Sequence, residues 1–245
     1  WAHHAPTDTP AIRAFGLANS ETGIIEAPET REGLLFLDIT QAVGRIPFSF
    51  AWSGADLAIL SAHKLGGPRG VGALIVRQGV DIPPLALGGG QEMGRRSGTE
   101  NTIGIAGFGA AAEAAQRDLS DGIWDRIKKL RKILEMAIED GGSPPIFVGH
   151  TRERLPNTSC IIAPGWKGET QVMAMDLAGF AISAGSACSS GKVKTSRVLM
   201  AMGYSEPDAG SAIRVSLGPA TTEEEVMRFA NTWRRHYDKN RSRAA

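Results

Sequence analysis

The sequence predicts an α/β fold, with a mainly parallel sheet flanked by helices and a smaller α/β domain at the C-terminal end. Short apolar runs typical of buried strands alternate with amphipathic helical stretches, and the 245 residues include 30 glycines. This alternation favours an α/β enzyme over a helical bundle or a β-sandwich. A chain of this length can bury a substantial core, and we expect residues 1–118 and 119–245 to form its two domains.

Three apolar runs predict the strands of the first domain. Residues 34–38 form a run that ends in a carboxylate, residues 56–60 form a second, and residues 70–76 follow a glycine–proline turn. Because the runs are continuously apolar and their connections short, we expect a sheet covered on both faces. A glycine-rich loop with two arginines follows at 88–99, and alanine-rich residues 103–116 predict a long helix.

The second domain is expected to mix short strands with helices. Apolar residues recur at helical spacing over 123–138, and a Gly-Gly-Ser-Pro-Pro turn ends that helix. Further strands are expected at 146–148, 158–162, 180–183 and 212–217, and further helices at 169–177 and 196–202. Thr222 and Glu225 have the spacing of a capping box, which predicts the start of a final helix.

Composition narrows the classes of function. The 27 basic and 26 acidic residues leave a net charge of +1, which argues against a general nucleic-acid binder. No apolar run has the length of a membrane span, and no signal-peptide pattern opens the chain. Two cysteines are too few for a disulfide framework, so a cytoplasmic protein is expected. The pair His3-His4 has no further ligand nearby in the sequence, so we predict no metal site.

Residues 61–68, with the sequence Ser-Ala-His-Lys-Leu-Gly-Gly-Pro, place one lysine between an apolar strand and a turn. A charged lysine at the end of a buried strand is costly unless something uses it. A Schiff base with an aldehyde cofactor would use Lys64, because desolvation favours the neutral, nucleophilic amine. Ser61 and His63 flank it with donors suited to a phosphate. A surface lysine in a turn is the alternative, and this segment alone leaves both open.

Asp38 closes the strand at 34–38. A carboxylate there can pair with a protonated pyridine nitrogen and keep the ring an electron sink, and Gln41 can donate a hydrogen bond to the phenolic oxygen of such a ring. The alternative for Asp38 is a helix cap after a strand. The loop at 88–99 can hold an anion through backbone amides and guanidinium groups, although a flexible linker fits the same residues.

The two cysteines have different surroundings. Cys188 lies among small polar residues in the segment 183–191, and cations that favour a thiolate follow it in the chain. We predict that Cys188 is a nucleophile carried on a loop. Cys160 stands beside Ile161 and Ile162, which is typical of a buried structural thiol.

Arg214 lies inside the apolar strand expected at 212–217. An arginine in such a strand requires a carboxylate partner. The α-carboxylate of a substrate would satisfy the guanidinium in bidentate fashion. An internal ion pair with Asp or Glu is the alternative, and the strand alone leaves both open.

Taken together, these segments occur in the order seen in pyridoxal-phosphate cysteine desulfurases of the class V aminotransferase family. The segments are Asp38-x-x-Gln41, residues 61–68, Arg95-Arg96-Ser97-Gly98-Thr99, Ser-x-Gly-Ser-Ala-Cys at 183–188, and Ile213-Arg214-Val215-Ser216-Leu217-Gly218. The chain resembles the group with the longer cysteine loop, which serves iron–sulfur cluster assembly, from about residue 17 to the final helix. The resemblance implies the fold-type I architecture of pyridoxal-phosphate-dependent transferases and a homodimer.

The resemblance also implies roles for the cofactor residues. Lys64 resembles the Schiff-base lysine and Asp38 the partner of the pyridinium nitrogen. Gln41 resembles the ring-oxygen contact, and Ser61 and His63 resemble phosphate ligands.

The substrate residues are implied in the same way. Cys188 resembles the cysteine that becomes a persulfide, and as a thiolate it could also be a transient ligand of an iron–sulfur cluster. Arg214 resembles the arginine that binds the substrate carboxylate, and Asn19 a second substrate contact. Thr99 resembles a residue that reaches the phosphate in the neighbouring subunit. Ser20 stands where the family has an asparagine that touches the cofactor, and a serine has a shorter reach.

The implied activity is the conversion of L-cysteine to L-alanine, with sulfur passing to Cys188 and then to a scaffold or another acceptor protein. A selenocysteine lyase or another pyridoxal-phosphate lyase or aminotransferase of this fold is one alternative, and a non-catalytic sulfur-relay fragment is another. The N-terminal part of the family fold, roughly the first third, is expected to be absent from this chain. That part would supply the histidine stacked on the pyridine ring and a phosphate-binding turn.

Overall fold

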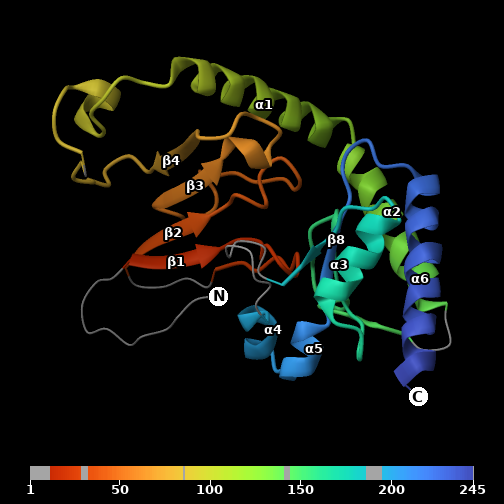
Figure 1. Ribbon diagram of the computed structural model, residues 1–245. Helices are drawn as coiled ribbons and strands as arrows, with labels where there is room; N and C mark the ends of the chain where they lie inside the picture. The colour runs from red at the N-terminus through yellow and green to blue at the C-terminus, as the bar shows by residue number, and fades with distance from the viewer. Residues whose placement is uncertain (1–11, 29–32, 85, 141–143, 186–194, 245) are drawn as a thin grey trace. The chain divides into compact units, whose positions relative to one another are not determined.

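The computed structural model describes residues 12–28, 33–84, 86–140, 144–185 and 195–244. The chain divides into two compact units (Figure 1). The first unit comprises the described residues up to Ala18 together with Glu26–Asp121, and the second comprises Asn19–Ile25 together with the described residues from Gly122 onward. Each unit has its own sheet.

The first unit is built on a four-stranded sheet in the order β1-β2-β3-β4 (Figure 1). β1 (Ile12–Gly16), β2 (Leu34–Asp38) and β3 (Leu57–Ser61) run parallel, and β4 (Gly72–Val76) is antiparallel to β3. The predicted α/β fold with a mainly parallel sheet is therefore confirmed. The core of this sheet is formed by Leu37, Ile39, Ala55 and Ala58, with partly buried Phe15, Leu35, Val43, Phe48 and Ile75 packed against them.

β1 was not predicted. Its burial pattern alternates irregularly, because it lies at the edge of the sheet and carries Arg13 near its middle. Ile12 is largely exposed. The strand therefore lacks both the continuous apolar run of a buried strand and a clean alternation of apolar and polar residues.

Helix α1 (Thr102–Ser120) follows a loop that contains the 3₁₀ turn η2 (Gln91–Gly94). Asn101 caps α1 by accepting a hydrogen bond from the Gly104 amide at 3.0 Å. Gly107 allows close packing on the turn after β3, since a Cβ at this glycine would lie 3.0 Å from Cγ of Pro68. The helix thereby packs on the segment 61–68.

The second unit has an antiparallel sheet in the order β5-β6-β8-β7. The strands are β5 (Ile146–Phe147), β6 (Thr158–Ile162), β7 (Ser183–Ala184) and β8 (Ala212–Ser216). The helices are α2 (Ile123–Glu139), α3 (Gly168–Leu177), α4 (Arg197–Ala201), α5 (Glu206–Gly210) and α6 (Glu223–Ala244). α2 and α6 lie side by side, and their apolar faces join the sheet in one core that includes Leu134, Ile161, Ile213, Phe229 and Trp233 (Figure 1).

Two local expectations for the second unit have different outcomes. The capping box is confirmed: the Thr222 amide donates to Glu225 Oε2 at 2.9 Å, and the Glu225 amide donates to Thr222 Oγ1 at 3.2 Å. The strand expected at 180–183 is wrong in its bounds, because only Ser183 and Ala184 pair with β8. In the described part of the chain, no helix is long and apolar enough to cross a membrane.

Candidate active site

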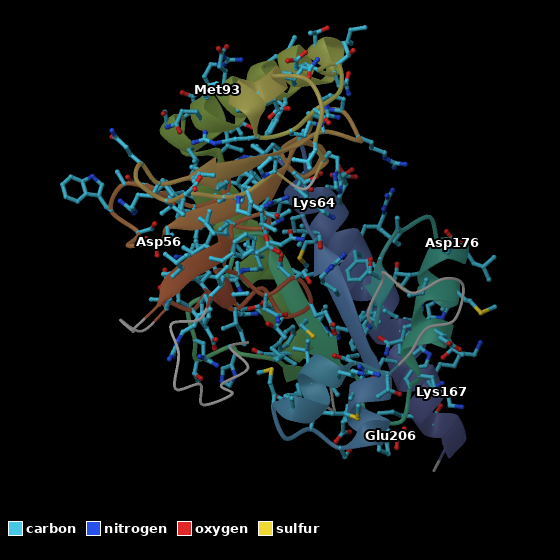
Figure 2. All side chains as sticks on the ribbon, turned by 90° about the vertical axis from the view of Figure 1, so that its left-hand side faces the viewer. Asp56, Lys64, Met93, Lys167, Asp176 and Glu206 are labelled. Atoms are coloured by element: carbon cyan, nitrogen blue, oxygen red, sulfur yellow. The ribbon has the colours of Figure 1, made fainter. Side chains whose placement is uncertain are left out.

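Lys64 ends η1 (Ala62–Lys64), a 3₁₀ turn that directly follows β3. The Ser61 hydroxyl and His63 Nδ1 lie 2.7 Å apart in a hydrogen bond. His63 and Lys64 are both exposed among the described residues, so the lysine that follows the buried strand is not itself enclosed. Figure 2 labels Asp56, just before β3, and Lys64, just after it, at opposite ends of the strand.

Asp38 is the last residue of β2 and pairs in register with Ile59 of the parallel strand β3. The carboxyl ends of parallel strands meet at one edge of a sheet, where α/β proteins bind their ligands. Asp38 and Lys64 therefore follow neighbouring strands to the same edge. The Asp38 carboxylate is exposed and its Oδ1 accepts the Thr40 amide at 2.9 Å, so it also shapes the turn after β2. Within the described residues 33–84, no helix follows Asp38 directly, so it is not the helix cap of the alternative.

Arg45 joins these two turns and was missed by our sequence reasoning. Its Nη1 donates to the Gln41 carbonyl and its Nη2 to the Lys64 carbonyl, both at 2.9 Å. Burial lowers the pKa of the Arg45 guanidinium. The sequence signal was weak, because Arg45 lies outside every predicted strand and helix and contacts main-chain atoms.

The loop before α1 uses one of its two arginines for its own folding. Arg96 Nη1 donates to the carbonyls of Gly98 and Thr99, at 3.0 and 3.2 Å. Ser97 Oγ donates to the Leu87 carbonyl at 3.3 Å. Thr99 is exposed, and among the described residues no side-chain hydrogen bond ties it to Lys64 or Asp38.

In the second unit, Arg214 extends from β8 toward the turn formed by Asn19–Ile25. Its Nη1 donates to the Ser20 carbonyl at 2.6 Å, and its Nη2 donates to Ser183 Oγ at 3.3 Å. Both of these hydrogen-bond partners are neutral. Its Nε is buried and has no hydrogen-bond partner among the described residues. The guanidinium is thus held by neutral groups of the second unit.

Asn19 builds the turn that presents the Ser20 carbonyl. Its Oδ1 accepts hydrogen bonds from the amides of Glu21 and Thr22, at 2.9 and 3.0 Å. Glu21 Oε2 accepts the Ser196 hydroxyl at 2.5 Å, and Ser196 also caps α4. The structure therefore brings Asn19, Ser20 and Arg214 together within the second unit, with the Ser20 main chain rather than its side chain in contact with the arginine.

The two cysteines stand differently in the structure. Cys160 is buried in β6, which confirms a structural thiol, and burial raises its pKa to about 12, with the Glu21 charge contributing. Cys188 lies in 186–194, outside the described residues.

The donors at the edge of the first unit suit a particular kind of cofactor. An exposed amine can bond an aldehyde, a carboxylate can pair with a protonated ring nitrogen, and a hydroxyl with an imidazole can donate to a phosphate. The described residues contain no group of three or more His, Cys, Asp and Glu side chains placed to hold a metal ion. The donor groups at this edge thus suit pyridoxal phosphate in kind.

The chain is similar to known proteins in both sequence and structure. Residues 9–229 match the family described as aminotransferase class-V. A cysteine desulfurase of Gluconacetobacter diazotrophicus is 42% identical over 225 residues, which cover 89% of this chain and 56% of that protein. A NifS-like protein from Rickettsia africae has a similar structure, with a TM-score of 0.83 and 32% identity over 94% of this chain and 62% of that one. A structure titled "SspA in complex with cysteine" matches with a TM-score of 0.64 and 25% identity, over 89% of this chain and 62% of that one.

The chain spans little more than half the length of the curated relatives it matches. The family match, by contrast, covers most of this chain and includes both the edge that carries Lys64 and the strand that carries Arg214. The chain therefore belongs to the aminotransferase class-V family, and its relatives there are cysteine desulfurases.

Proposed function

We propose that the protein is a pyridoxal-phosphate-dependent cysteine desulfurase that converts L-cysteine to L-alanine and transfers the sulfur to Cys188. The observation that carries this proposal is the placement of Lys64 and Asp38 after neighbouring parallel strands, at the same edge of one sheet. The similarity to curated cysteine desulfurases supports the same reaction.

The first unit would bind the cofactor. When bound, pyridoxal phosphate supplies an electron sink that weakens the bonds at the α-carbon of an amino acid. The Lys64 amine would bond the aldehyde, release it to the incoming substrate and then move a proton at the α-carbon. Asp38 would hold the proton on the ring nitrogen, and Gln41 would donate to the ring oxygen. Ser61 and His63 would donate to the phosphate, where their mutual hydrogen bond sets their orientation.

The second unit would bind and attack the substrate. Arg214 would hold the carboxylate of L-cysteine, with its guanidinium oriented by the Ser20 carbonyl and Ser183. The Cys188 thiolate would attack the substrate sulfur: a sulfur–sulfur bond forms, the carbon–sulfur bond breaks, and its electron pair is protonated on carbon to give alanine. The complex of a related protein with cysteine supports this substrate.

We also propose that the chain works as a homodimer. In the first unit, Ile103 of α1 and the loop residues Leu87 and Met93 are more than four-fifths exposed. A second copy that covers these side chains would remove them from water. In that arrangement Thr99 would reach the phosphate held by the neighbouring subunit. A protein that accepts the persulfide sulfur, such as a scaffold for iron–sulfur clusters, and a cytoplasmic location complete the proposal.

The test uses full-length protein supplied with pyridoxal phosphate. L-Cysteine should yield equimolar alanine and persulfide, borohydride should fix the cofactor on Lys64, and Lys64→Ala should abolish both results. Cys188→Ala should abolish persulfide formation while the cofactor is still fixed on Lys64. If Cys188→Ala forms alanine at the wild-type rate, the protein is another lyase of this fold. If wild-type protein fixes no cofactor, a sulfur-relay role replaces the enzyme.

A further inference from the structure

We propose that Arg45 is a positioning residue, which holds the backbone of Lys64 in register with the turn that follows Asp38. The proposal rests on the proposed function, since it assigns Lys64 to the cofactor. It adds a residue to that site which makes no contact with cofactor or substrate and acts through the main chain.

The guanidinium of Arg45 bridges two segments of the first unit. Its two terminal nitrogens donate to the carbonyls of Gln41 and Lys64, each at 2.9 Å. The Lys64 carbonyl lies 19 positions further along the chain, after β3, whereas Gln41 belongs to the turn after β2. Because the guanidinium is a rigid planar fork, the two bonds together fix the separation and the relative orientation of the two turns.

The turn that carries Arg45 is itself well defined. The amide of Arg45 donates to the Ala42 carbonyl at 3.0 Å, and the amides of Ala42 and Val43 both donate to the Ile39 carbonyl at 3.0 Å. These bonds form a compact turn directly after Asp38. The backbone of Arg45 is therefore held in place by these hydrogen bonds.

Close packing beside Arg45 also links the turn after β2 to the turn that carries Lys64. Gly44 has a φ of +77°, and a Cβ there would lie 2.7 Å from Leu65 Cδ2 and 2.9 Å from the Cβ of Ala115 in α1. Leu65 is the residue after Lys64. The turn after β2 thus approaches the lysine turn through both the Gly44 contact and the Arg45 bridge.

Arg45 is partly buried, so its guanidinium requires hydrogen-bond acceptors within the protein. Burial works against the charged guanidinium, and the two carbonyl oxygens compensate for part of its lost hydration. A side chain of similar length without donors would remove both hydrogen bonds. The Lys64 backbone would then be free to shift relative to Asp38, and small displacements of a reacting group carry large losses of rate.

The chain offers a matched control in the same unit. Arg77 also joins main-chain carbonyls, with Nε donating to Ala55 at 2.7 Å and Nη2 donating to Phe50 at 3.3 Å. These partners precede β3, at the end of the strand marked by Asp56 in Figure 2 and opposite to Lys64. Arg77→Met therefore removes a similar set of bonds without touching the lysine turn.

The experiment compares wild type, Arg45→Met, Arg45→Lys and Arg77→Met in full-length protein. Two quantities are measured: the melting temperature of the cofactor-free protein, and the rate at which added pyridoxal phosphate becomes fixed on Lys64 by borohydride, followed by peptide mass spectrometry. We expect Arg45→Met to slow fixation by about tenfold or more at a melting temperature equal to that of Arg77→Met. Arg77→Met should stay within about twofold of the wild-type rate. Arg45→Lys should recover only part of the loss, since an ammonium group can donate to a carbonyl but lacks the planar fork that holds both.

Wild-type rates of fixation in Arg45→Met would overturn the proposal. Equal slowing in Arg45→Met and Arg77→Met would also overturn it, because the loss would then follow stability alone. If Arg45→Met does not fold, Arg45→Gln decides by the same criterion, as its shorter amide cannot span both carbonyls. If wild-type protein fixes no cofactor on Lys64, the proposed function is wrong. If wild-type protein fixes the cofactor and Arg45→Met fixes it at the same rate, only the inference about Arg45 is wrong.

Discussion

Cys160 of β6 lies directly opposite Arg214 of β8 in the antiparallel register of the second unit. The two side chains nevertheless have different surroundings. Cys160 is buried, and burial raises its pKa to about 12, although the charges of Arg214 and Arg154 work in the opposite direction. The arginine that we assign to the substrate carboxylate therefore does not convert its neighbour in the sheet into a nucleophile.

We predict that Cys160 stays unreactive in the native protein. At pH 8 to 9 its thiol is protonated and enclosed, so iodoacetamide should alkylate Cys188 and leave Cys160 unmodified until denaturant is added. Peptide mass spectrometry after a timed pulse measures both sites. In Cys188→Ala no native alkylation should remain, and modification of Cys160 in that variant would contradict the prediction.

A buried ionic cluster in the second unit should make stability depend on pH. Glu135 accepts hydrogen bonds from Arg154 Nη1 at 2.9 Å and from the Ser159 hydroxyl at 2.6 Å, and it pairs with Arg131 at 3.0 Å. Burial works to raise the pKa of Glu135, but these hydrogen bonds and charges outweigh it and hold the pKa below the ordinary 4.5.

Because the folded pKa is lowered, the contribution of Glu135 to stability is complete above pH 4.5 and is lost as the pH falls through the folded value. Glu135→Gln should reduce the free energy of unfolding at pH 7 by about 3 kcal/mol, since it leaves two buried arginines without a carboxylate. Urea titrations at pH 7 and pH 3.5 should show a smaller acid-induced loss in the variant than in wild type. Glu225→Gln, at an exposed cap, is the control and should cost less.

A side chain at Gly44 would have two separable effects: a steric clash with Leu65 and Ala115, and the strain of a left-handed backbone. Gly44 and Gly54 have similar φ values, +77° and +73°, but a Cβ at Gly54 would meet nothing within 4 Å. Gly54→Ala should therefore cost only the strain of a left-handed backbone, about 1 kcal/mol, whereas Gly44→Ala should cost at least about 1 kcal/mol more. Equal losses in urea titrations would show that the turn can move away from Leu65.

The sequence predicts those parts of the structure whose signals lie in neighbouring residues. It misses those that depend on contacts between residues far apart in the chain. β6 was predicted at its observed bounds because it ends in the apolar run Cys-Ile-Ile, and every one of its residues is buried. Lys64 and Asp38 were found because each follows such a run. The sequence left the exposure of Lys64 open, and in the structure Lys64 is exposed at the end of the turn η1. Arg45 gave no signal, because its partners are carbonyls 4 and 19 residues away.

If the exposed apolar side chains of the first unit form the dimer interface, a charge placed among them should weaken the dimer. Ile103 lies in the first turn of α1 and is 87% exposed in the isolated chain. If a second copy covers it, Ile103→Asp should weaken the dimer by about tenfold or more, because a carboxylate would be placed in an apolar contact. Sedimentation across a range of concentrations measures this. Trp52→Asp, at a side chain that is 91% exposed in the same unit but away from α1 in sequence, should leave assembly unchanged.

Arg214 should act on substrate affinity and not on cofactor attachment. Its bonds to the Ser20 carbonyl and to Ser183 hold the guanidinium in place, and we assign its charge to the carboxylate of the substrate. Arg214→Gln should therefore raise the KM for L-cysteine by roughly thirtyfold, which corresponds to about 2 kcal/mol of lost charge-assisted hydrogen bonding. Ser183→Ala removes only the longer bond, at 3.3 Å, and should raise KM by no more than about threefold. Borohydride fixation on Lys64 should be unchanged in both variants, because we assign Arg214 to the carboxylate of the substrate and not to the cofactor. An unchanged KM in Arg214→Gln would remove Arg214 from the substrate site, whereas loss of fixation would show that it acts on the cofactor.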